Sequence, residues 1–216
     1  MNLCRAPRHL RMQDRESLTV QVTMARQRAA FERSGAPKDG ELLEGIKARD
    51  MHAFERMYRA YQPRLARFVI NLVHRPELVE EVVNDTMMAV WNSAQNFRGA
   101  SRVSTWVFGI AYRQAMKARR RWDMPVESIP DNEQPSLEDG PDDALRLGQA
   151  HDALVAAMDT LTPDHRAVVD LTYFHGMGYR EIAEIVDCPP ETVKTRMFHA
   201  RRKLRDVLAG DLADWL

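Results

Sequence analysis

The sequence predicts an all-α protein, in which a flexible acidic linker joins two small helical domains. Apolar residues recur at three- and four-residue spacing along two long stretches, as they do on one face of a helix. No stretch alternates apolar and polar residues in the way that indicates a strand. A proline-rich acidic segment separates the two stretches, and the second one contains a helix-turn-helix pattern.

A basic extension, residues 1–40, precedes the first domain. It carries eight Lys or Arg residues against four Asp or Glu residues, and only Met24–Phe31 shows weak helical spacing. We expect most of this extension to be disordered, because it has few apolar groups to bury. One extra folded helix is the alternative, and Met24 is an alternative start of translation.

The first domain is expected over residues 41–122 and begins with helical spacing from Glu41. Pro63 lies inside this pattern and predicts either a kink or the first turn of a new helix. Pro76 begins the next helix, a break follows at 96–102, and a last helix runs over 104–121. The expected inward positions are Leu42, Leu43, Ile46, Ala53, Phe54, Met57, Tyr58, Tyr61, Leu65, Phe68, Val69, Leu72, Val73, Leu78, Val82, Val83, Met87, Val90, Trp91, Trp106, Val107, Ile110 and Met116.

The linker is expected over residues 123–143, which contain four prolines and eight acids. Proline interrupts helices and like charges repel, so this segment should be extended and flexible. The stretch 123–150, which contains this linker, has a net charge of −7 that suits a positively charged channel, although an ordinary solubilising spacer has the same composition.

The second domain is expected over residues 144–210. A helix over 145–158 is followed by one that Thr162 caps, with Pro163 at its first position and Gly176 at its end. The expected core positions of this capped helix are Val168, Val169, Leu171, Thr172 and Phe174.

A helix-turn-helix follows at the end of this domain. Tyr179–Val186 is a short amphipathic helix, and its small Ala183 suits a tight helix crossing. Asp187 tolerates the left-handed conformation that the turn needs, and a new helix begins near Pro190. The expected inward positions of the two helices are Ile182, Ala183, Val186, Val193, Met197, Ala200 and Leu204.

The outward face of the second helix combines short hydroxyls, long cations and an aromatic ring. Such a face fits a DNA major groove, with its cations on phosphates, and a solvated basic helix is the alternative. The residues of this face are Thr192, Lys194, Thr195, Arg196, Phe198, His199, Arg201 and Arg202.

Other classes of function find little support in the sequence. The two cysteines, Cys4 and Cys188, and the seven histidines show no metal-ligand spacing, so we expect neither a metal nor another cofactor. No phosphate-binding loop, nucleophile elbow or similar enzyme motif is present, so the chain is not expected to be an enzyme. No apolar run is long enough for a membrane span or a signal peptide, which predicts a cytoplasmic protein without membrane insertion.

Two blocks of the sequence resemble the extracytoplasmic-function (ECF) sigma factors, a small two-domain group of the bacterial sigma-70 family. The first block contains Val79–Trp91, Phe97–Trp106 and Ile110-Ala111, and the second contains Leu161–Asp164 and Tyr179–Leu204. The resemblance implies a region 2 domain over 41–122 and a region 4 domain over 144–210. A stand-alone helix-turn-helix regulator is the alternative, but it leaves the first block unexplained.

The resemblance implies three sets of contacts. The −35 promoter element would be read by Thr192, Lys194, Thr195, Arg196, Phe198, His199 and Arg201. The −10 element would be read and melted by Phe97, Arg98, Ser101, Arg102, Trp106, Tyr112, Arg113, Lys117 and Arg120. The clamp helices of the β′ subunit of core RNA polymerase would bind Glu81, Asn84 and Asp85.

Three of these assignments have an open point in this sequence. His199 stands where many members of the family have an arginine, which makes one phosphate contact uncertain or dependent on pH. Arg113 stands where some members have an asparagine, so the preferred −10 base does not follow. Trp106 suits the core as well as it suits base stacking. The resemblance also implies an anti-sigma protein as a partner, beside core RNA polymerase and promoter DNA.

Overall fold

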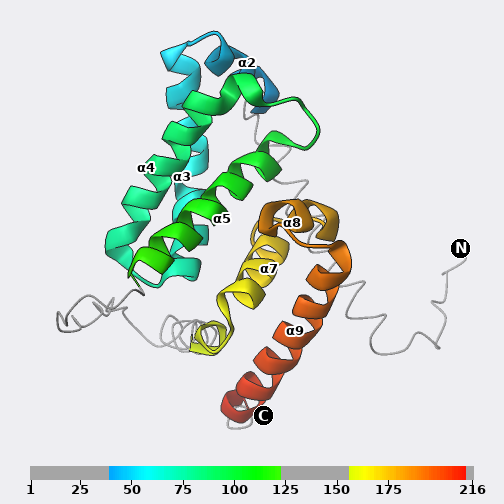
Figure 1. Cartoon of the computed structure of the whole chain (residues 1–216). Coiled ribbons are helices and arrows are strands. Elements are labelled where there is room, and N and C mark those ends of the chain that lie inside the picture. The colour runs from blue at the N-terminus through cyan, green and yellow to red at the C-terminus, as the bar shows by residue number, and fades with distance from the viewer. Residues whose placement is uncertain (1–38, 123–155, 213–216) are drawn as a thin grey trace, which may run out of the picture.

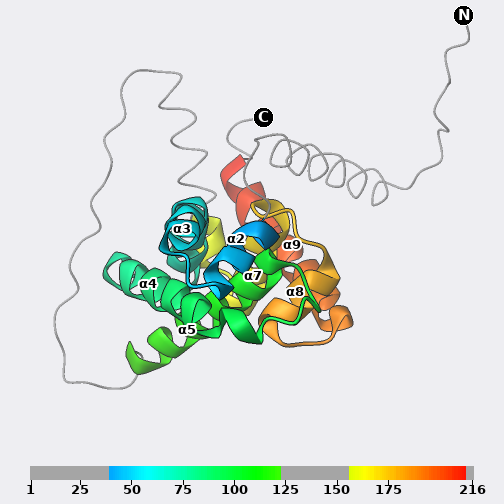
Figure 2. The ribbon, with the colours of Figure 1, turned by 90° about the horizontal axis from the view of Figure 1, so that it is seen from above.

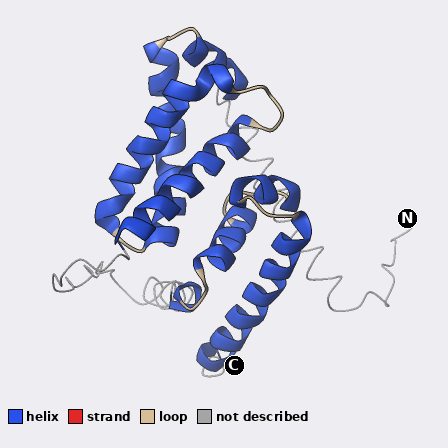
Figure 3. Ribbon diagram, in the orientation of Figure 1, coloured by secondary structure: helices blue, strands red, loops and turns tan. Residues whose placement is uncertain are grey.

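The computed structural model describes residues 39–122 and 156–212, and all the regular structure in these ranges is helical (Figure 1 and Figure 3). The predicted extension before Asp39, the acidic linker and most of the helix expected over 145–158 lie outside the described residues. Within the described residues, no helix is both long enough and apolar enough to cross a membrane.

The first half of the molecule is a bundle of α3 (Met51–Val73), α4 (Pro76–Ser93) and α5 (Val103–Trp122), with α2 (Asp39–Lys47) at one end (Figure 1). Each of the three long helices packs against the other two, and α2 packs mainly on α3. Helix α4 continues into a short 3-10 helix, η1 (Ala94–Asn96), and a loop then leads into α5. The view from above shows α3, α4 and α5 around one centre (Figure 2).

The sequence pattern predicted the core of this bundle well. Most of the expected inward side chains are buried, and Phe54, Tyr58, Trp91 and Trp106 are partly buried against the core. Phe68 and Phe108 meet edge to face at the centre, with 5.3 Å between their ring centroids.

Helix α3 runs through Pro63 without a break, so the prediction of a new first turn at Pro63 is wrong. A proline inside a helix costs about 3 kcal/mol, because it removes one hydrogen bond and crowds the preceding turn. Pro63 itself faces solvent, whereas Tyr61 and Leu65 on either side of it are fully buried. Burial of these neighbours therefore offsets the local cost and keeps α3 helical through Pro63.

The second half contains α7 (Pro163–Tyr173), α8 (Tyr179–Val186) and α9 (Pro190–Leu212), after a helical end at residues 156–159. The side chain of Thr162 caps α7 by accepting a hydrogen bond from the backbone N–H of His165, as predicted. Asp187 adopts the expected left-handed conformation, with φ 52°, in the turn between α8 and α9. Gly176 does the same after α7, with φ 62°.

Phe174, at the end of α7, is a correction to the predicted core. It is 39% exposed, and the guanidinium carbon of Arg67 lies 3.9 Å from its ring centroid. The ring lies where α7 meets α3, and a cation from the other half covers one of its faces.

The two halves pack directly against each other. Helix α5 packs against α8, and α3 packs against α7. Buried side chains form one continuous cluster that includes both halves. The sequence predicted two domains joined by a linker, but it did not predict that they share an interface.

A tight contact between α2 and α3 gives the first testable prediction. A Cβ atom at Gly45 would lie 2.5 Å from the Cβ of Ala53, whereas a Cβ at Gly40 in the same helix would meet nothing within 4 Å. Gly45→Ala should therefore lower the free energy of unfolding by about 1–3 kcal/mol, because the two helices must move apart. Gly40→Ala is the matched control and should be neutral or slightly stabilising. Urea denaturation checks both, and equal midpoints for the two variants would contradict the prediction.

Candidate nucleic-acid and partner interfaces

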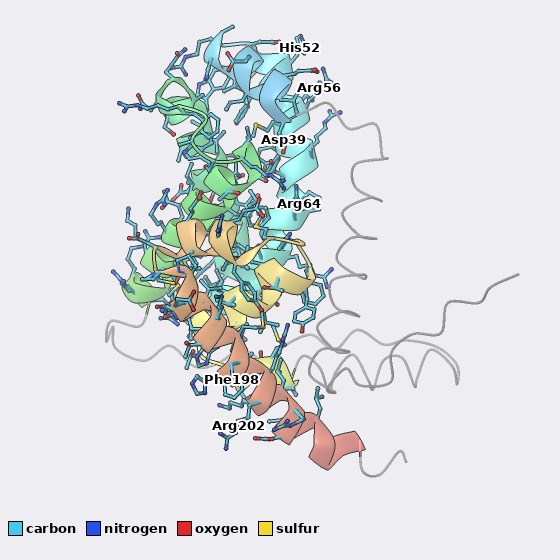
Figure 4. The ribbon with its side chains drawn as sticks, turned by 90° about the vertical axis from the view of Figure 1, so that its right-hand side faces the viewer. Asp39, His52, Arg56, Arg64, Phe198 and Arg202 are labelled. Atoms are coloured by element: carbon cyan, nitrogen blue, oxygen red, sulfur yellow. The ribbon has the colours of Figure 1, made fainter. Side chains whose placement is uncertain are left out.

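The first candidate surface is the outward face of α9, the second helix of the helix-turn-helix. Val193, Met197 and Ala200 are buried on its inner side. Five predicted contact residues lie exposed on the outer side: Lys194, Thr195, His199, Arg201 and Phe198, the last of them 61% exposed. Figure 4 shows Phe198 and Arg202 on the outward side of this helix. A large exposed aromatic ring beside cations is an arrangement that suits contact with nucleic acid.

Contacts within the protein hold several polar side chains of this face. Lys194 Nζ lies 2.8 Å from Glu191 Oε1, and the Thr195 hydroxyl donates to the Glu191 carbonyl at 3.0 Å. Arg201 Nε donates to the Tyr173 hydroxyl at 3.1 Å. The Lys194 pair is exposed and therefore weak, so this side chain can turn to another anion at little cost.

Arg196 and Thr192 are less accessible than the rest of this set. The Arg196 side chain is only 22% exposed, and its Nη2 donates to Asp164 Oδ2 at 2.7 Å. This charged hydrogen bond ties the start of α7 to α9. Thr192 is half-buried. Both residues are therefore placed to support the exposed face more than to form it.

A pair of histidines joins α7 and α9 beside this surface. The rings of His165 and His199 stack, with 6.4 Å between their centroids. Burial lowers the pKa of His165, and the neighbouring His199 and Arg196 lower it further. Sequence reasoning identified His199 and missed His165, because the pairing depends on how α7 crosses α9.

The second candidate surface begins in the loop between η1 and α5. Phe97 packs on Trp106 with 5.1 Å between their ring centroids, and both rings are partly buried. Arg98 is exposed and Ser101 is half-exposed in the same loop. Trp106 is thus neither a fully buried core residue nor a free stacking platform, but half of an aromatic pair at the edge of the bundle.

The surface continues along α5, where accessibility changes with position. Arg113, Lys117 and Arg120 are exposed. Tyr112 is half-buried, and its hydroxyl donates to Asp164 Oδ1 at 3.0 Å. Burial, followed by the charge of Asp164, raises the pKa of Tyr112 to about 12, so this side chain keeps its proton near neutral pH.

Arg102 is also engaged by the second half of the molecule. Its Nη1 lies 3.3 Å from Glu181 Oε1, at the start of α8. Of the nine residues predicted for the −10 element, Arg102 and Tyr112 therefore contact the helix-turn-helix half.

The third candidate surface is the exposed face of α4. Glu81, Asn84 and Asp85 are all exposed there, as the pattern predicted. Asn84 Oδ1 accepts a hydrogen bond from the Tyr58 hydroxyl at 2.7 Å, and Arg121 Nη2 lies 2.6 Å from Glu81 Oε1. Met88 continues this face one turn later and is 51% exposed. It was not predicted, although its spacing from Asn84 and Asp85 could have identified it.

Arg166 is a buried polar residue that links the two halves, and sequence reasoning missed it. It is 5% exposed and donates to the carbonyls of Met158, Asp159 and Leu161 within its own half. Its Nη1 also donates to the carbonyl of Asn71 in α3 at 2.9 Å. Its position in an apolar helical stretch was the available signal. Among the described residues, no cluster of His, Cys, Asp or Glu is arranged to hold a metal ion.

The shifted histidines predict how stability depends on pH. Burial lowers the pKa of both His74 and His165. For His74, the charge of Arg166 lowers the pKa further, and the charge of Asp159 raises it in part. The unfolded chain therefore binds more protons once the pH falls below about 6.5, the ordinary histidine value. The free energy of unfolding should have its full value above this pH and should decrease as the pH falls toward 5.5.

A double His74→Gln, His165→Gln variant checks this origin. Its urea midpoint should change less between pH 7 and 5.5 than that of the unaltered protein, because glutamine does not titrate. An equal change in both proteins would show that other groups cause the dependence.

Comparison with known proteins gives matches in both halves. The family profile described as "Sigma-70 region 2" matches residues 57–123, and the profile described as "Sigma-70, region 4" matches residues 151–204. The RNA polymerase sigma-H factor of Pseudomonas aeruginosa is 26% identical and covers 79% of this chain and 94% of its own length. The ECF RNA polymerase sigma-E factor of Escherichia coli is 28% identical, with coverages of 77% and 92%.

Two solved structures have the same fold. RpoE from Bartonella quintana, solved with the anti-sigma factor NepR, matches with a TM-score of 0.54 and 25% identity over 72% of this chain and 96% of its own. CnrH, solved with the cytosolic domain of CnrY, matches with a TM-score of 0.60 and 22% identity, over 80% of this chain and 98% of the CnrH chain. The region 2 and region 4 matches lie in the two halves that the structure describes. This chain therefore belongs to the sigma-70 family, as an ECF sigma factor.

Proposed function

We propose that this chain directs core RNA polymerase to specific promoters by reading the −35 element with α9 and the −10 element with the loop before α5 and α5 itself. The observation that carries the proposal is the exposed face of α9. Its inner side is buried in a helix-turn-helix, and its outer side presents Lys194, Thr195, Phe198 and His199. This geometry suits insertion of the helix into a major groove.

Reading the −10 element requires single-stranded bases to be caught as the duplex opens. Aromatic rings stack on any base, and cations bind the phosphates between the bases. Phe97 and Trp106 supply an aromatic pair beside the exposed Arg98, while Arg113, Lys117 and Arg120 follow along α5. The last three form a basic path that suits the adjoining duplex.

The exposed face of α4 suits the clamp helices of the polymerase β′ subunit. An acid beside an amide can accept hydrogen bonds from arginines of a partner helix, through the carboxylate and the amide oxygen. Asp85 and Asn84 supply this pair, and the exposed Met88 adds an apolar contact next to them. An anti-sigma factor is a further expected partner, since the related RpoE was solved with one.

Run-off transcription with core polymerase from the same bacterium tests the assignment on a library of genomic fragments. Asp85→Lys should weaken binding to core polymerase at least about tenfold, because it places a cation against the expected arginines. Glu55→Lys makes the same charge change at an exposed side chain of α3, away from this face, and should leave binding to core polymerase unchanged. The absence of any start-site selection by the unaltered protein would refute the proposed function.

The role of α9 is tested on a promoter that this screen identifies. Lys194→Ala and Phe198→Ala should each reduce transcription from it about tenfold, the scale of one lost base contact. Both side chains are exposed, so the fold should survive, and a circular dichroism melt checks this. Arg205→Ala removes an exposed cation further along α9 and should have a smaller effect that added salt diminishes. Equal losses for all three variants would point to nonspecific binding alone.

A further inference from the structure

We propose that His165 on α7 and His199 on α9 bind one backbone phosphate of the −35 element together, and that this contact makes promoter binding tighter as the pH falls. The inference rests on the proposed function and adds to it a DNA contact from α7 and a dependence on pH. We call His165, His199 and Lys203 the histidine site.

The two histidine rings lie on neighbouring helices and stack on each other. Helix α7 packs against α9, and Figure 1 shows the two side by side. The ring planes of His165 and His199 are 29° apart, and their centroids are 6.4 Å apart. His199 is exposed and His165 is half-exposed, so an anion from solution can reach both. Two rings at this separation repel each other when both carry a proton, and an anion near both offsets that repulsion.

Cations outnumber acids around His165. Burial is the largest cause of its lowered pKa, and His199, Arg196 and Lys203, all on α9, lower that pKa further. Asp164, its neighbour on α7, acts in the opposite direction. A place where several cations oppose the protonation of a histidine is electropositive, and such a place attracts an anion.

Asp164, the acid beside the histidine site, is engaged through both of its carboxylate oxygens. Its Oδ2 accepts a hydrogen bond from Arg196 Nη2 at 2.7 Å. Its Oδ1 accepts from the hydroxyl of Tyr112, which reaches it from α5, at 3.0 Å. Asp164 therefore cannot turn toward a protonated His165 without losing one of these bonds, which leaves the charge of His165 to an anion from outside the protein.

The histidine site continues the face of α9 that is proposed to read the −35 element. Thr195, His199 and Lys203 follow one another at four-residue spacing, so they lie along one side of the helix over about 12 Å. The His199 ring lies 5.5 Å from the ring of Phe198, and Lys203 Nζ donates to the Thr160 carbonyl beside the start of α7. The first residues of a recognition helix meet base edges, and cations beyond them meet phosphates.

Proton binding and phosphate binding support each other at such a site. A phosphate beside His165 favours the charged ring and raises its pKa, against the effect of the cations in the free protein. By linkage, protonation of His165 raises the affinity for DNA by the same factor. Because the pKa of His165 in the free protein lies below the ordinary value of about 6.5, the affinity should increase as the pH falls through this value.

Promoter binding by the protein together with core polymerase tests this dependence. The promoter comes from the run-off screen, and the buffers have one ionic strength and contain no inorganic phosphate. The unaltered protein should bind about fivefold more tightly at pH 6.0 than at pH 7.5, and His165→Gln should reduce this ratio to less than about twofold. His52→Gln removes an exposed histidine of α3 and is the matched control, which should keep the full ratio.

A fixed charge and an altered DNA separate charge from shape. Arginine stays charged at both pH values, so His165→Arg should bind at pH 7.5 about as tightly as the unaltered protein binds at pH 6.0. An uncharged methylphosphonate at the contacted position of the −35 element should remove the dependence on pH. The side chain of His165 lies outside the core, so the variants should fold, and circular dichroism melts check this. A full ratio in His165→Gln, or in every methylphosphonate duplex, would overturn the proposal.

A proton NMR titration of the free chain separates the histidine site from the proposed function. His165→Gln assigns the resonance of His165, whose pKa should rise when inorganic phosphate replaces chloride at equal ionic strength, while the resonance of His52 should not respond. No response of His165 would overturn the histidine site even in a protein that selects promoters. A response in a protein that selects no promoter would refute the proposed function and identify free phosphate, not DNA, as the ligand.

Discussion

The burial of Arg166 is the constraint around which the two halves are arranged. A guanidinium removed from water is costly unless its donors are paired, and this one donates to three carbonyls that begin the second half and to one in α3. Burial also lowers its pKa, yet an arginine stays charged near neutral pH. The hydrogen bonds of Arg166 therefore fix the position of residues 158–161 relative to the end of α3.

In that geometry α5 packs against the second half of the molecule with residues that we also propose to contact promoter DNA. The inner side of α5 belongs to the first bundle, where Val107, Phe108 and Ala111 are buried. A neighbouring side meets α8, and the residues that would handle promoter DNA lie along this boundary and beyond it. Tyr112 illustrates this, because it is one of the residues that we propose for the −10 element, and its hydroxyl donates to Asp164 of the other half.

The helix-turn-helix depends on local chemistry to a greater degree. Asp187 provides the left-handed turn, and Glu181 accepts from the backbone N–H of Gly178 to cap α8. Small Ala183 and Ala200 are buried where helices meet. Since these features are encoded by neighbours in sequence, local residue patterns are sufficient to identify the motif and its outward face.

The sequence by itself determined the helical class, the positions of nearly all helices and the side of each helix that is buried, because these follow from residue spacing and from capping residues such as Thr162 and Asp187. It also indicated the exposed contact faces of α4 and α9. The sequence left open whether a helix begins at Pro63, and it misjudged Phe174, because packing between distant segments decided both. Only the tertiary structure decided that the halves pack together, and that Arg102, Tyr112 and Arg196 are held by acids from other helices. The partners of those three residues lie between 32 and 79 positions away, and no local pattern specifies a contact at that range.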